Sequence, residues 1–275
     1  MFPAAEDSSG VRLSARVASL TDVGRKRRNN EDNFIVCPLN GSPAAAGDEE
    51  HTFGLESPGL LMVVADGMGG HFGGEVASRL GVEDLVLQFL QKVQNPEVPP
   101  ADPQDILRQA VEAAHKTVYA HSQAHNENLT MGTTLTAVWL IQSWATIAQV
   151  GDSRAYLFRD GNLVLLTQDQ TIGNLLQSRG EESMMIGEEV KEMLTQALGA
   201  QPDIEVVTSA VELQQGDRML LCSDGLYKLV PPEVLVECLE ASGDASLIAG
   251  QLISRANENG GRDNITAILA EIRAA

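Results

Sequence analysis

The sequence contains no apolar run long enough to cross a bilayer. Its longest apolar segments, residues 60–65 and 135–141, are the length of strands, whereas a membrane-spanning helix needs about 20 residues. The first ten residues, MFPAAEDSSG, are acidic where a secretory signal carries a basic segment followed by an apolar one. We therefore predict a cytoplasmic protein that does not span a membrane.

Paired cysteines and basic charge are also scarce. The three cysteines, Cys37, Cys222 and Cys238, are odd in number and widely spaced and include no CxxC pair, so a disulfide framework is not expected. Against 38 Asp and Glu there are 19 Lys and Arg, and the formal net charge of -19 argues against binding to nucleic acid or to an anionic membrane. Excess acid suits the recruitment of cations, although it also serves simply to keep a surface soluble.

The first third of the chain alternates between strand and loop patterns. Residues 11–17 alternate apolar and polar positions, which predicts a strand with one buried face, and residues 34–37 are predicted to form a paired strand. Residues 41–59 are rich in Gly, Pro, Ser and acid and are predicted to form an exposed loop. The run LLMVVA then predicts a buried strand that stops at Asp66.

The rest of the chain combines long helices with hairpins. Helices are predicted over residues 75–93 and from the cap pair Asp102 and Pro103, whereas residues 133–166 predict an antiparallel meander with a turn at Asp160-Gly161. Later segments predict helical structure over 170–200, two strands over 204–223, helices over 231–239 and 245–257, and a last strand over 264–272. With 43% hydrophobic residues, the chain is expected to be an α+β layered single domain over residues 11–275, after a flexible N-terminus of residues 1–10.

Four aspartates stand at the ends of predicted strands. Asp66, Asp152 and Asp224 follow apolar strands, and Asp263 precedes the last one. A single aspartate after a strand is commonly a turn former or a helix cap. Four of them can converge on one edge of a sheet core, on supports rigid enough to hold a metal ion.

Glycine follows two of these aspartates and extends the metal hypothesis. Gly67 and Gly225 would let the backbone approach closely and offer a carbonyl oxygen as a further ligand. Because no His or Cys cluster is present, an oxygen-only site favours Mg²⁺ or Mn²⁺ over Zn²⁺. Two such ions can deprotonate a shared water, orient a phosphoryl group and stabilise an in-line displacement. The pattern therefore predicts hydrolysis of phosphate esters without a protein nucleophile.

Six strings in order carry a family resemblance over about residues 15 to 271. They are RKRRNNEDNF, VVADGMGGHFGGEVAS, MGTTLTAV, VGDSRAYLFR, LLCSDGLYKLV and GGRDNITAIL. Together they resemble the metal-dependent serine/threonine protein phosphatases, the PPM or type 2C family, in its bacterial style. The resemblance implies a four-layer αββα sandwich, with two antiparallel sheets face to face, helices outside and metals in a channel at one edge. It also implies hydrolysis of phosphoserine and phosphothreonine in proteins by a metal-activated bridging water.

The resemblance assigns a role to each metal-site residue. Asp66 matches the ligand that bridges two Mn²⁺ or Mg²⁺ ions, and Gly67 matches the backbone-carbonyl ligand of the second ion. Asp224 and Asp263 match the remaining carboxylates of the first ion.

Three further acidic residues match more distant roles in the family. Glu31 and Asp32 match an acidic pair that touches the second ion directly or through its waters. Asp152 resembles the residue that shares a weaker third ion with Asp224.

Two arginines are given different roles. Arg27 occupies the position whose guanidinium grips the substrate phosphate, and a planar fork that stays charged suits two phosphate oxygens. Its neighbours Arg25, Lys26 and Arg28 permit the alternative of a solvated basic run, but the spacing to NNED favours Arg27. Arg154 is predicted to be structural, anchoring its loop to a carboxylate.

The proton donor and the substrate-selecting segment depart from the family pattern. Met68 stands where eukaryotic relatives carry a histidine proposed as general acid, so the donor is either His71 or a metal-bound water. Gln170 stands where many relatives have histidine. Residues 173–192 correspond to the flap beside the active site, where substrate choice is expected to lie.

Rival functions fit the sequence less well. A cysteine phosphatase needs arginine six residues after the cysteine, and this chain has Pro43, Lys228 and Asp244 at those positions. The GxxxxGK[ST] loop of nucleotide enzymes and the strings of kinases are absent, and the acidic surface disfavours a nuclease. The alternative from another class is a catalytically inactive PPM-like binding or regulatory module, but the chain keeps every metal carboxylate. We expect a monomer acting on phosphoproteins, opposed to a cognate serine/threonine kinase.

Overall fold

The computed structural model describes residues 12–41, 49–69, 73–94, 102–125, 131–181 and 186–275, so the predicted N-terminal segment, residues 1–10, lies outside it. Within these ranges the chain forms twelve strands and seven helices. The strands are β1 (Leu13–Asp22), β2 (Asp32–Pro38), β3 (His51–Gly54), β4 (Leu60–Met68), β5 (Gly132–Thr133), β6 (Leu135–Ile141), β7 (Trp144–Val150), β8 (Arg154–Arg159), β9 (Asn162–Leu165), β10 (Val207–Glu212), β11 (Arg218–Cys222) and β12 (Ile265–Ala274). The helices are α1 (Gly73–Val93), α2 (Pro103–His125), α3 (Ile172–Ser178), α4 (Glu188–Lys191), α5 (Asp224–Tyr227), α6 (Pro232–Glu240) and α7 (Ala245–Glu258).

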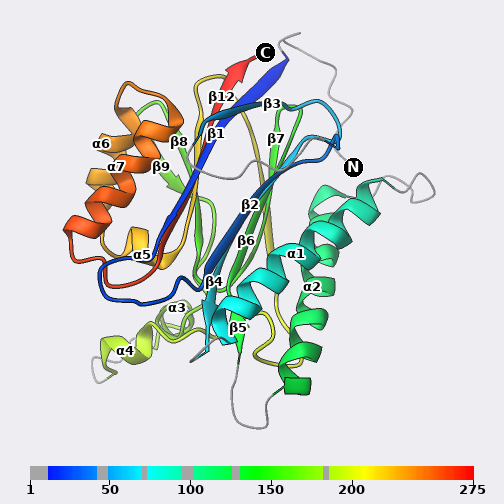
Figure 1. The fold of residues 1–275 in the computed structure, drawn as a ribbon, viewed down its shortest axis with the longest axis vertical. Coiled ribbons are helices and arrows are strands. Elements are labelled where there is room, and N and C mark those ends of the chain that lie inside the picture. The colour runs from blue at the N-terminus through cyan, green and yellow to red at the C-terminus, as the bar shows by residue number, and fades with distance from the viewer. Residues whose placement is uncertain (1–11, 42–48, 70–72, 95–101, 126–130, 182–185) are drawn as a thin grey trace.

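The strands form two antiparallel six-stranded sheets. The first has the order β3-β1-β12-β11-β8-β9, and the second has the order β10-β7-β6-β4-β2, with β5 paired to β4. Figure 1 shows the two sheets packed face to face, with α6 and α7 outside the first sheet and α1 and α2 outside the second. The αββα sandwich implied by the resemblance is therefore confirmed.

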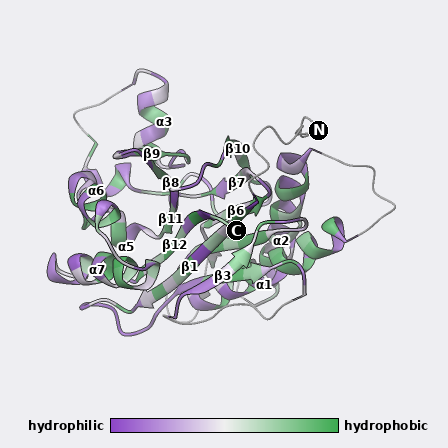
Figure 2. Ribbon diagram, turned by 90° about the horizontal axis from the view of Figure 1, so that it is seen from above, coloured by the Kyte–Doolittle hydropathy of each residue, from purple (hydrophilic) through white to green (hydrophobic). Residues whose placement is uncertain are grey.

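Three apolar layers hold this sandwich together. One lies between the sheets and includes Val17, Val64 and Ile268, which are at most 1% exposed. A second lies between the first sheet and α6 and α7, and a third lies between the second sheet and α1 and α2. The view from above shows green apolar strands inside, flanked by helices with purple outer faces (Figure 2). Burial of apolar surface on both faces of each sheet is the main stabilising contribution to such a fold.

Most of the predicted helices are confirmed, because their caps and apolar faces are local features. The backbone N–H of Gln104 donates to Asp102 Oδ1 at 3.1 Å, so Asp102 caps α2 as expected. The predicted inward face of α2, including Leu107 and Val111, is fully buried. The turn at Asp160-Gly161 is also confirmed, with φ of 51° and 76° at its two residues.

Residues 34–37 lie in a paired strand as predicted, since β2 pairs with β4, whereas β1 pairs with β12 and β3 in the other sheet. The expected meander is interrupted, because β7 lies in the second sheet and β8 in the first. The switch occurs at Gly151–Ser153 and places Asp152 at the junction between the sheets. Local periodicity predicts strands but does not say which sheet a strand joins.

Other corrections concern element boundaries. The predicted loop of residues 41–59 contains strand β3, which pairs with β1. Strand β4 does not stop at Asp66 but continues to Met68, where it pairs with β5. The short helix α5 begins at Asp224 and was not predicted.

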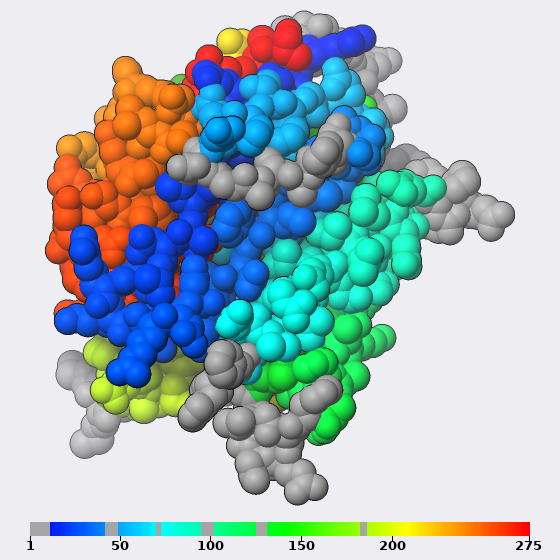
Figure 3. All heavy atoms as spheres, in the orientation of Figure 1, coloured from blue at the N-terminus to red at the C-terminus, as the bar shows by residue number. Residues whose placement is uncertain are grey.

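The loop between β1 and β2 and the segment with α3 and α4 lie at the same end of the sandwich. In Figure 3 this loop, in blue, lies directly above the yellow-green flap segment on the surface of the molecule. Among the described helices, none is both long enough and apolar enough to cross a membrane.

Candidate active site

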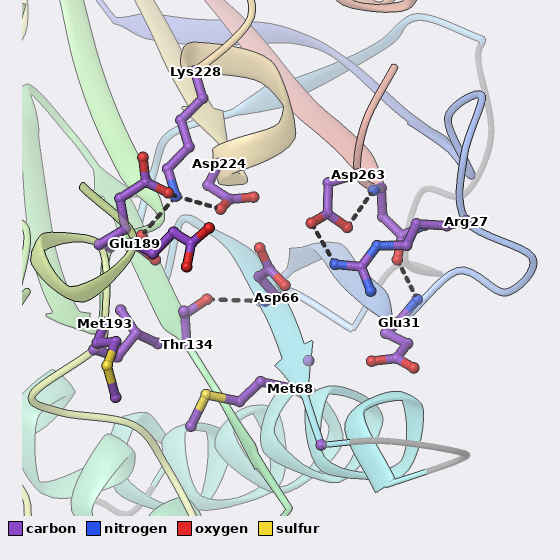
Figure 4. Close-up of a pocket in the computed structure, with 16 residues that line it drawn as sticks. Arg27, Glu31, Asp66, Met68, Thr134, Glu189, Met193, Asp224, Lys228 and Asp263 are labelled. Atoms are coloured by element: carbon purple, nitrogen blue, oxygen red, sulfur yellow. Dashed lines mark hydrogen bonds and ion pairs between the residues drawn. The ribbon is translucent and has the colours of Figure 1, made fainter. Parts of the chain in front are cut away.

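A pocket of about 380 Å³ opens at this end of the sandwich. Seven of the eight residues predicted to form the site line it: Arg27, Glu31, Asp66, Gly67, Asp152, Asp224 and Asp263. They come from both sheets and from the loops that connect them, and Figure 4 shows the side chains of Asp66, Asp224 and Asp263 around a common space. The flap contributes Glu189 and Glu192 to the opposite wall, and the two residues that follow the flap, Met193 and Leu194, also line it.

Asp66 is held near the end of β4 by its own backbone. Its N–H donates to Thr134 Oγ1 at 2.9 Å, and its carbonyl accepts from the N–H of Thr134 at 2.9 Å and from Thr133 Oγ1 at 3.0 Å. Within the described part of the chain, no donor is paired with the Asp66 carboxylate itself. A rigid strand thus presents an uncompensated carboxylate to the pocket (Figure 4).

Gly67 cannot carry a side chain at its position. A Cβ atom there would overlap the carbonyl oxygens of Gly74 and Glu31. The Gly67 N–H donates to the Glu31 carbonyl at 3.1 Å, which joins β4 to the segment that leads into β2. The requirement for glycine therefore comes from the close packing of three backbone segments under the pocket.

Asp224 begins α5, and its two carboxylate oxygens lie in different surroundings. Oδ2 pairs with Lys228 Nζ at 2.8 Å, whereas Oδ1 is buried and has no hydrogen-bond partner in the described structure. The following Gly225 packs so closely on Asn264 that a Cβ atom would overlap the Asn264 carbonyl. A buried oxygen without a partner is costly, so it marks a place where a cation would stabilise the protein.

Asp263 is paired with Arg27 across the mouth of the pocket. Arg27 Nη2 donates to Asp263 Oδ2 at 2.7 Å, and the two side chains are 54% and 34% exposed. Such an exposed pair is weak and can be exchanged for another partner. Arg27 is therefore available both to Asp263 and to an anion entering the pocket.

Asn264 organises the loop that carries Arg27 and was missed in the sequence. Its side chain donates to the carbonyls of Val23 and Asn29 at 3.0 and 2.9 Å and accepts from the N–H of Glu31 at 2.8 Å. Its only signal in the sequence is its place next to Asp263 in the string RDN. The side-chain amide of Asn264 thus holds both ends of the loop that carries Arg27.

Asp32 lies beneath the pocket and does not line it. Its side chain is 5% exposed, and Oδ2 accepts from Ser223 Oγ and Thr266 Oγ1, both at 2.7 Å. Oδ1 is buried without a partner among the described residues. Burial is the main cause that raises the pKa of Asp32 to about 7, and the charges of Asp224 and Asp263 add to it.

Asp152 occupies the loop where the chain changes sheets. Its side chain is 5% exposed, and Tyr227 Oη donates to its Oδ2 at 3.1 Å. Burial, followed by the charge of Asp224, raises the pKa of Asp152 to about 6. The loop is braced by Gln170, whose Oε1 accepts from the N–H of Gly151 at 2.7 Å.

Arg154 has the structural role predicted for it. Its Nε and Nη2 donate to Asp169 at 2.9 and 2.6 Å, which is a bidentate pair. Its guanidinium also lies over the ring of Tyr227, 3.7 Å from the centroid. Arg154 therefore positions Tyr227, which in turn contacts Asp152.

Lys228 is the second residue of the site that sequence reasoning missed. Its Nζ lies 2.8 Å from Asp224, 3.3 Å from Glu192 of the flap and 3.8 Å from Asp152. In the sequence it served only to exclude a cysteine-phosphatase motif. The available signal was its spacing four residues after Asp224, which places the two side chains on one helical face.

The proton donor was predicted to be either His71 or a metal-bound water, and His71 lies outside the described residues. Met68, which stands where eukaryotic relatives carry a histidine, lines the pocket and has no proton to donate.

The balance of charge in the pocket favours divalent cations. Among the described residues, seven acidic and two basic side chains line it, an excess of five acids. Burial, followed by the charges of Asp32 and Asp224, raises the pKa of Asp66 well above its ordinary value. An all-oxygen donor set of this kind fits Mg²⁺ or Mn²⁺.

The donors are not gathered into a tight cage. No three carboxylate, imidazole or thiol side chains in the described ranges are grouped closely enough to hold one ion. Hard cations such as Mg²⁺ commonly take only one or two carboxylates and complete their shell with other oxygens, including water. The spread of Asp66, Asp224 and Asp263 around the Gly67 backbone is compatible with that mode of binding.

Comparison with known proteins identifies the family to which this chain belongs. The family model described as protein phosphatase 2C matches residues 46–270. The serine/threonine phosphatase stp of Listeria monocytogenes is 35% identical over 253 residues, 91% of this chain and 93% of that protein. The structure of Mycobacterium tuberculosis serine/threonine phosphatase PstP/Ppp superimposes with a TM-score of 0.75 at 32% identity, over 94% of this chain and 99% of that one. A structure of the PstP catalytic domain in complex with two manganese ions gives 0.74 at 33% identity, over 95% and 99%. This chain therefore belongs to the protein phosphatase 2C family.

Proposed function

We propose that this protein serine/threonine phosphatase hydrolyses phosphoserine and phosphothreonine esters with two Mn²⁺ or Mg²⁺ ions held around Asp66. The observation that carries the proposal is the uncompensated Asp66 carboxylate at the floor of an acidic pocket. In this proposal Asp66 would be shared by both ions. The Gly67 carbonyl and Glu31 would serve one of them, and Asp224 Oδ1 and Asp263 would serve the other.

Asp32 supports this centre from below. Its carboxylate is fixed by the hydroxyls of Ser223 and Thr266, so its charge is held within the protein close to Asp66. When bound, the two cations would offset these buried charges, lower the pKa of a shared water and neutralise charge on the phosphoryl oxygens. No side chain needs to form a covalent bond to phosphorus.

Arg27 is the residue that we assign to the substrate phosphate. Its guanidinium stands at the pocket mouth, is more than half exposed and uses one nitrogen for Asp263. The planar fork can therefore donate two parallel hydrogen bonds to a phosphate dianion. The excess of acid behind it would repel that dianion, so Arg27 and the bound cations would together offset this repulsion.

The substrate class is inferred from the chemistry of the site and from the relatives, and the cellular compartment from the cysteines. Phosphoproteins are the substrate class, and we propose a serine/threonine kinase as the enzyme that supplies them. The three cysteines are unpaired, which supports a reducing compartment such as the cytoplasm.

A phosphopeptide panel assayed with Mn²⁺ and with Mg²⁺ tests the proposal. We expect hydrolysis of p-nitrophenyl phosphate and of phosphoserine and phosphothreonine peptides, stopped by EDTA and restored by the metal. Asp224→Asn is expected to lose metal-dependent activity, and retained activity would refute the ligand assignment. A folded wild type that is inert on every substrate with both metals would favour the inactive binding module instead.

A further inference from the structure

Lys228 brings a fixed positive charge to two carboxylates of the active site. Its Nζ stands 2.8 Å from Asp224 Oδ2 and 3.8 Å from Asp152 Oδ2. These are the two residues that the resemblance pairs at a weaker third cation. Figure 4 shows the lysine side chain reaching from α5 toward Asp224 on the flap side of the pocket.

The position of this ammonium group is determined by its own helix. The N–H of Lys228 donates to the Asp224 carbonyl at 3.0 Å, so the two side chains lie one turn apart. The preceding residue, Tyr227, donates to the same Asp152 oxygen and is itself covered by Arg154. Tyr227 thus supplies a hydrogen bond and Lys228 a positive charge to Asp152 from adjacent positions in the chain.

A lysine in this place cannot coexist with a third metal ion on the same oxygens. An ammonium group has three donors and no lone pair, so it cannot serve as a ligand while it is charged. A lysine side chain has an ordinary pKa of about 10.4 and is therefore a charged ammonium group at neutral pH.

The two carboxylate oxygens of Asp224 can serve different partners, one the metal centre and the other Lys228. Oδ2 is taken by Lys228, whereas Oδ1 is buried and has no partner in the described structure. Asp224 can therefore serve one of the two core cations through Oδ1 without losing its lysine. An additional cation bound between Asp224 and Asp152 would have to displace the ammonium group.

We propose that the ammonium group of Lys228 takes the place of a third metal ion, so that this phosphatase binds two divalent cations and no more. The proposal rests on the two-cation centre proposed above. It also gives the flap a link to that centre, because Lys228 contacts Glu192 at 3.3 Å. The resemblance implied a weaker third cation on Asp152, and the residues here do not fit it.

The number of Mn²⁺ ions bound per chain tests this proposal without an activity assay. Purified protein is dialysed against Mn²⁺ up to millimolar concentration, and free Mn²⁺ is measured by electron paramagnetic resonance. Lys228→Asp removes the ammonium group and adds a carboxylate ligand, whereas Lys228→Met removes the charge and keeps most of the side-chain volume. Lys191→Asp is the matched control, because Lys191 lies on the flap and its Nζ pairs with Glu188 at 2.6 Å.

We expect two ions per chain for the wild type and for Lys191→Asp, and three for Lys228→Asp. Three ions on the wild type would overturn the proposal, and so would two on a Lys228→Asp protein with a native circular dichroism spectrum. If Lys228→Asp does not fold, Lys228→Met decides in the same way, with a third, weaker ion expected. Fewer than two ions on the wild type would be a different failure, since it would refute the two-cation centre and this inference with it.

Discussion

Asp32→Asn is expected to stabilise the metal-free protein at neutral pH while leaving its stability at acidic pH unchanged. Asp32 is 5% exposed, and its Oδ1 atom has no partner in the described structure. Asparagine keeps an oxygen to accept from Ser223 and Thr266, as a protonated aspartic acid does. The substitution therefore removes the buried charge and little else.

The size and sign of the effect follow from the pKa. In the folded protein the Asp32 pKa rises from an ordinary 3.8 to about 7, so the folded state holds its proton more tightly than the unfolded state does. This contribution to stability is fully present below about pH 4 and is lost as the pH rises through about 7. At about 1.36 kcal/mol per pKa unit, the loss is on the order of 4 kcal/mol. Asp32→Asn escapes this loss because it does not ionise.

Urea denaturation in EDTA at pH 4.5 and pH 8 measures the difference. We expect the two proteins to be similar at the lower pH and the variant to be more stable by up to about 4 kcal/mol at the higher pH. Saturating Mn²⁺ should reduce or reverse that advantage, because bound cations compensate the wild-type charge. An Asp32→Asn protein that is less stable than wild type at pH 8 in EDTA would refute the reasoning.

Asp217→Asn provides a control at another buried aspartate. Its side chain is 1% exposed and accepts from Arg159 Nε and Nη2 at 2.7 and 2.6 Å, outside the pocket. Breaking this pair should destabilise the protein by about 1 to 3 kcal/mol at both pH values, with or without Mn²⁺. At pH 8 in EDTA, Asp32→Asn is thus expected to raise the free energy of unfolding and Asp217→Asn to lower it. The first substitution removes an unfavourable buried charge, whereas the second removes a paired one.

Two further substitutions test the substrate grip and the floor of the pocket. Arg27→Ala should lower kcat/KM for a phosphopeptide by about 10- to 100-fold with Mn²⁺ stoichiometry unchanged, since it removes charge-assisted hydrogen bonds, and Arg27→Lys should recover only part of it. Kinetics equal to wild type would contradict the assignment. Gly67→Ala should destabilise the protein by about 1 to 3 kcal/mol, because its Cβ atom overlaps the Gly74 and Glu31 carbonyls. Urea denaturation measures this, and an unchanged midpoint would show that the backbone can move apart.

The sequence by itself determined the chemistry of the site. Aspartates at strand ends and glycine after Asp66 predict an oxygen-donor metal centre, the family resemblance predicts that Arg27 binds the phosphate, and seven of the eight predicted residues line one pocket. Helix α2 could also be predicted, because its cap at Asp102 and its apolar stripe are encoded over a few neighbouring residues.

Only the tertiary structure decided how the strands are shared between the sheets and where the charges are balanced. Strand periodicity is the same for either sheet, so it did not reveal that β7 and β8 separate at Asp152. Nor did the sequence distinguish Asp32, which lies beneath the pocket, from Glu31, which lines it. The contact of Lys228 with Asp152 exists only because the fold brings Asp152 beside the helix that begins at Asp224 and is followed by Lys228. Electrostatic interactions act through space, and the fold alone sets those distances.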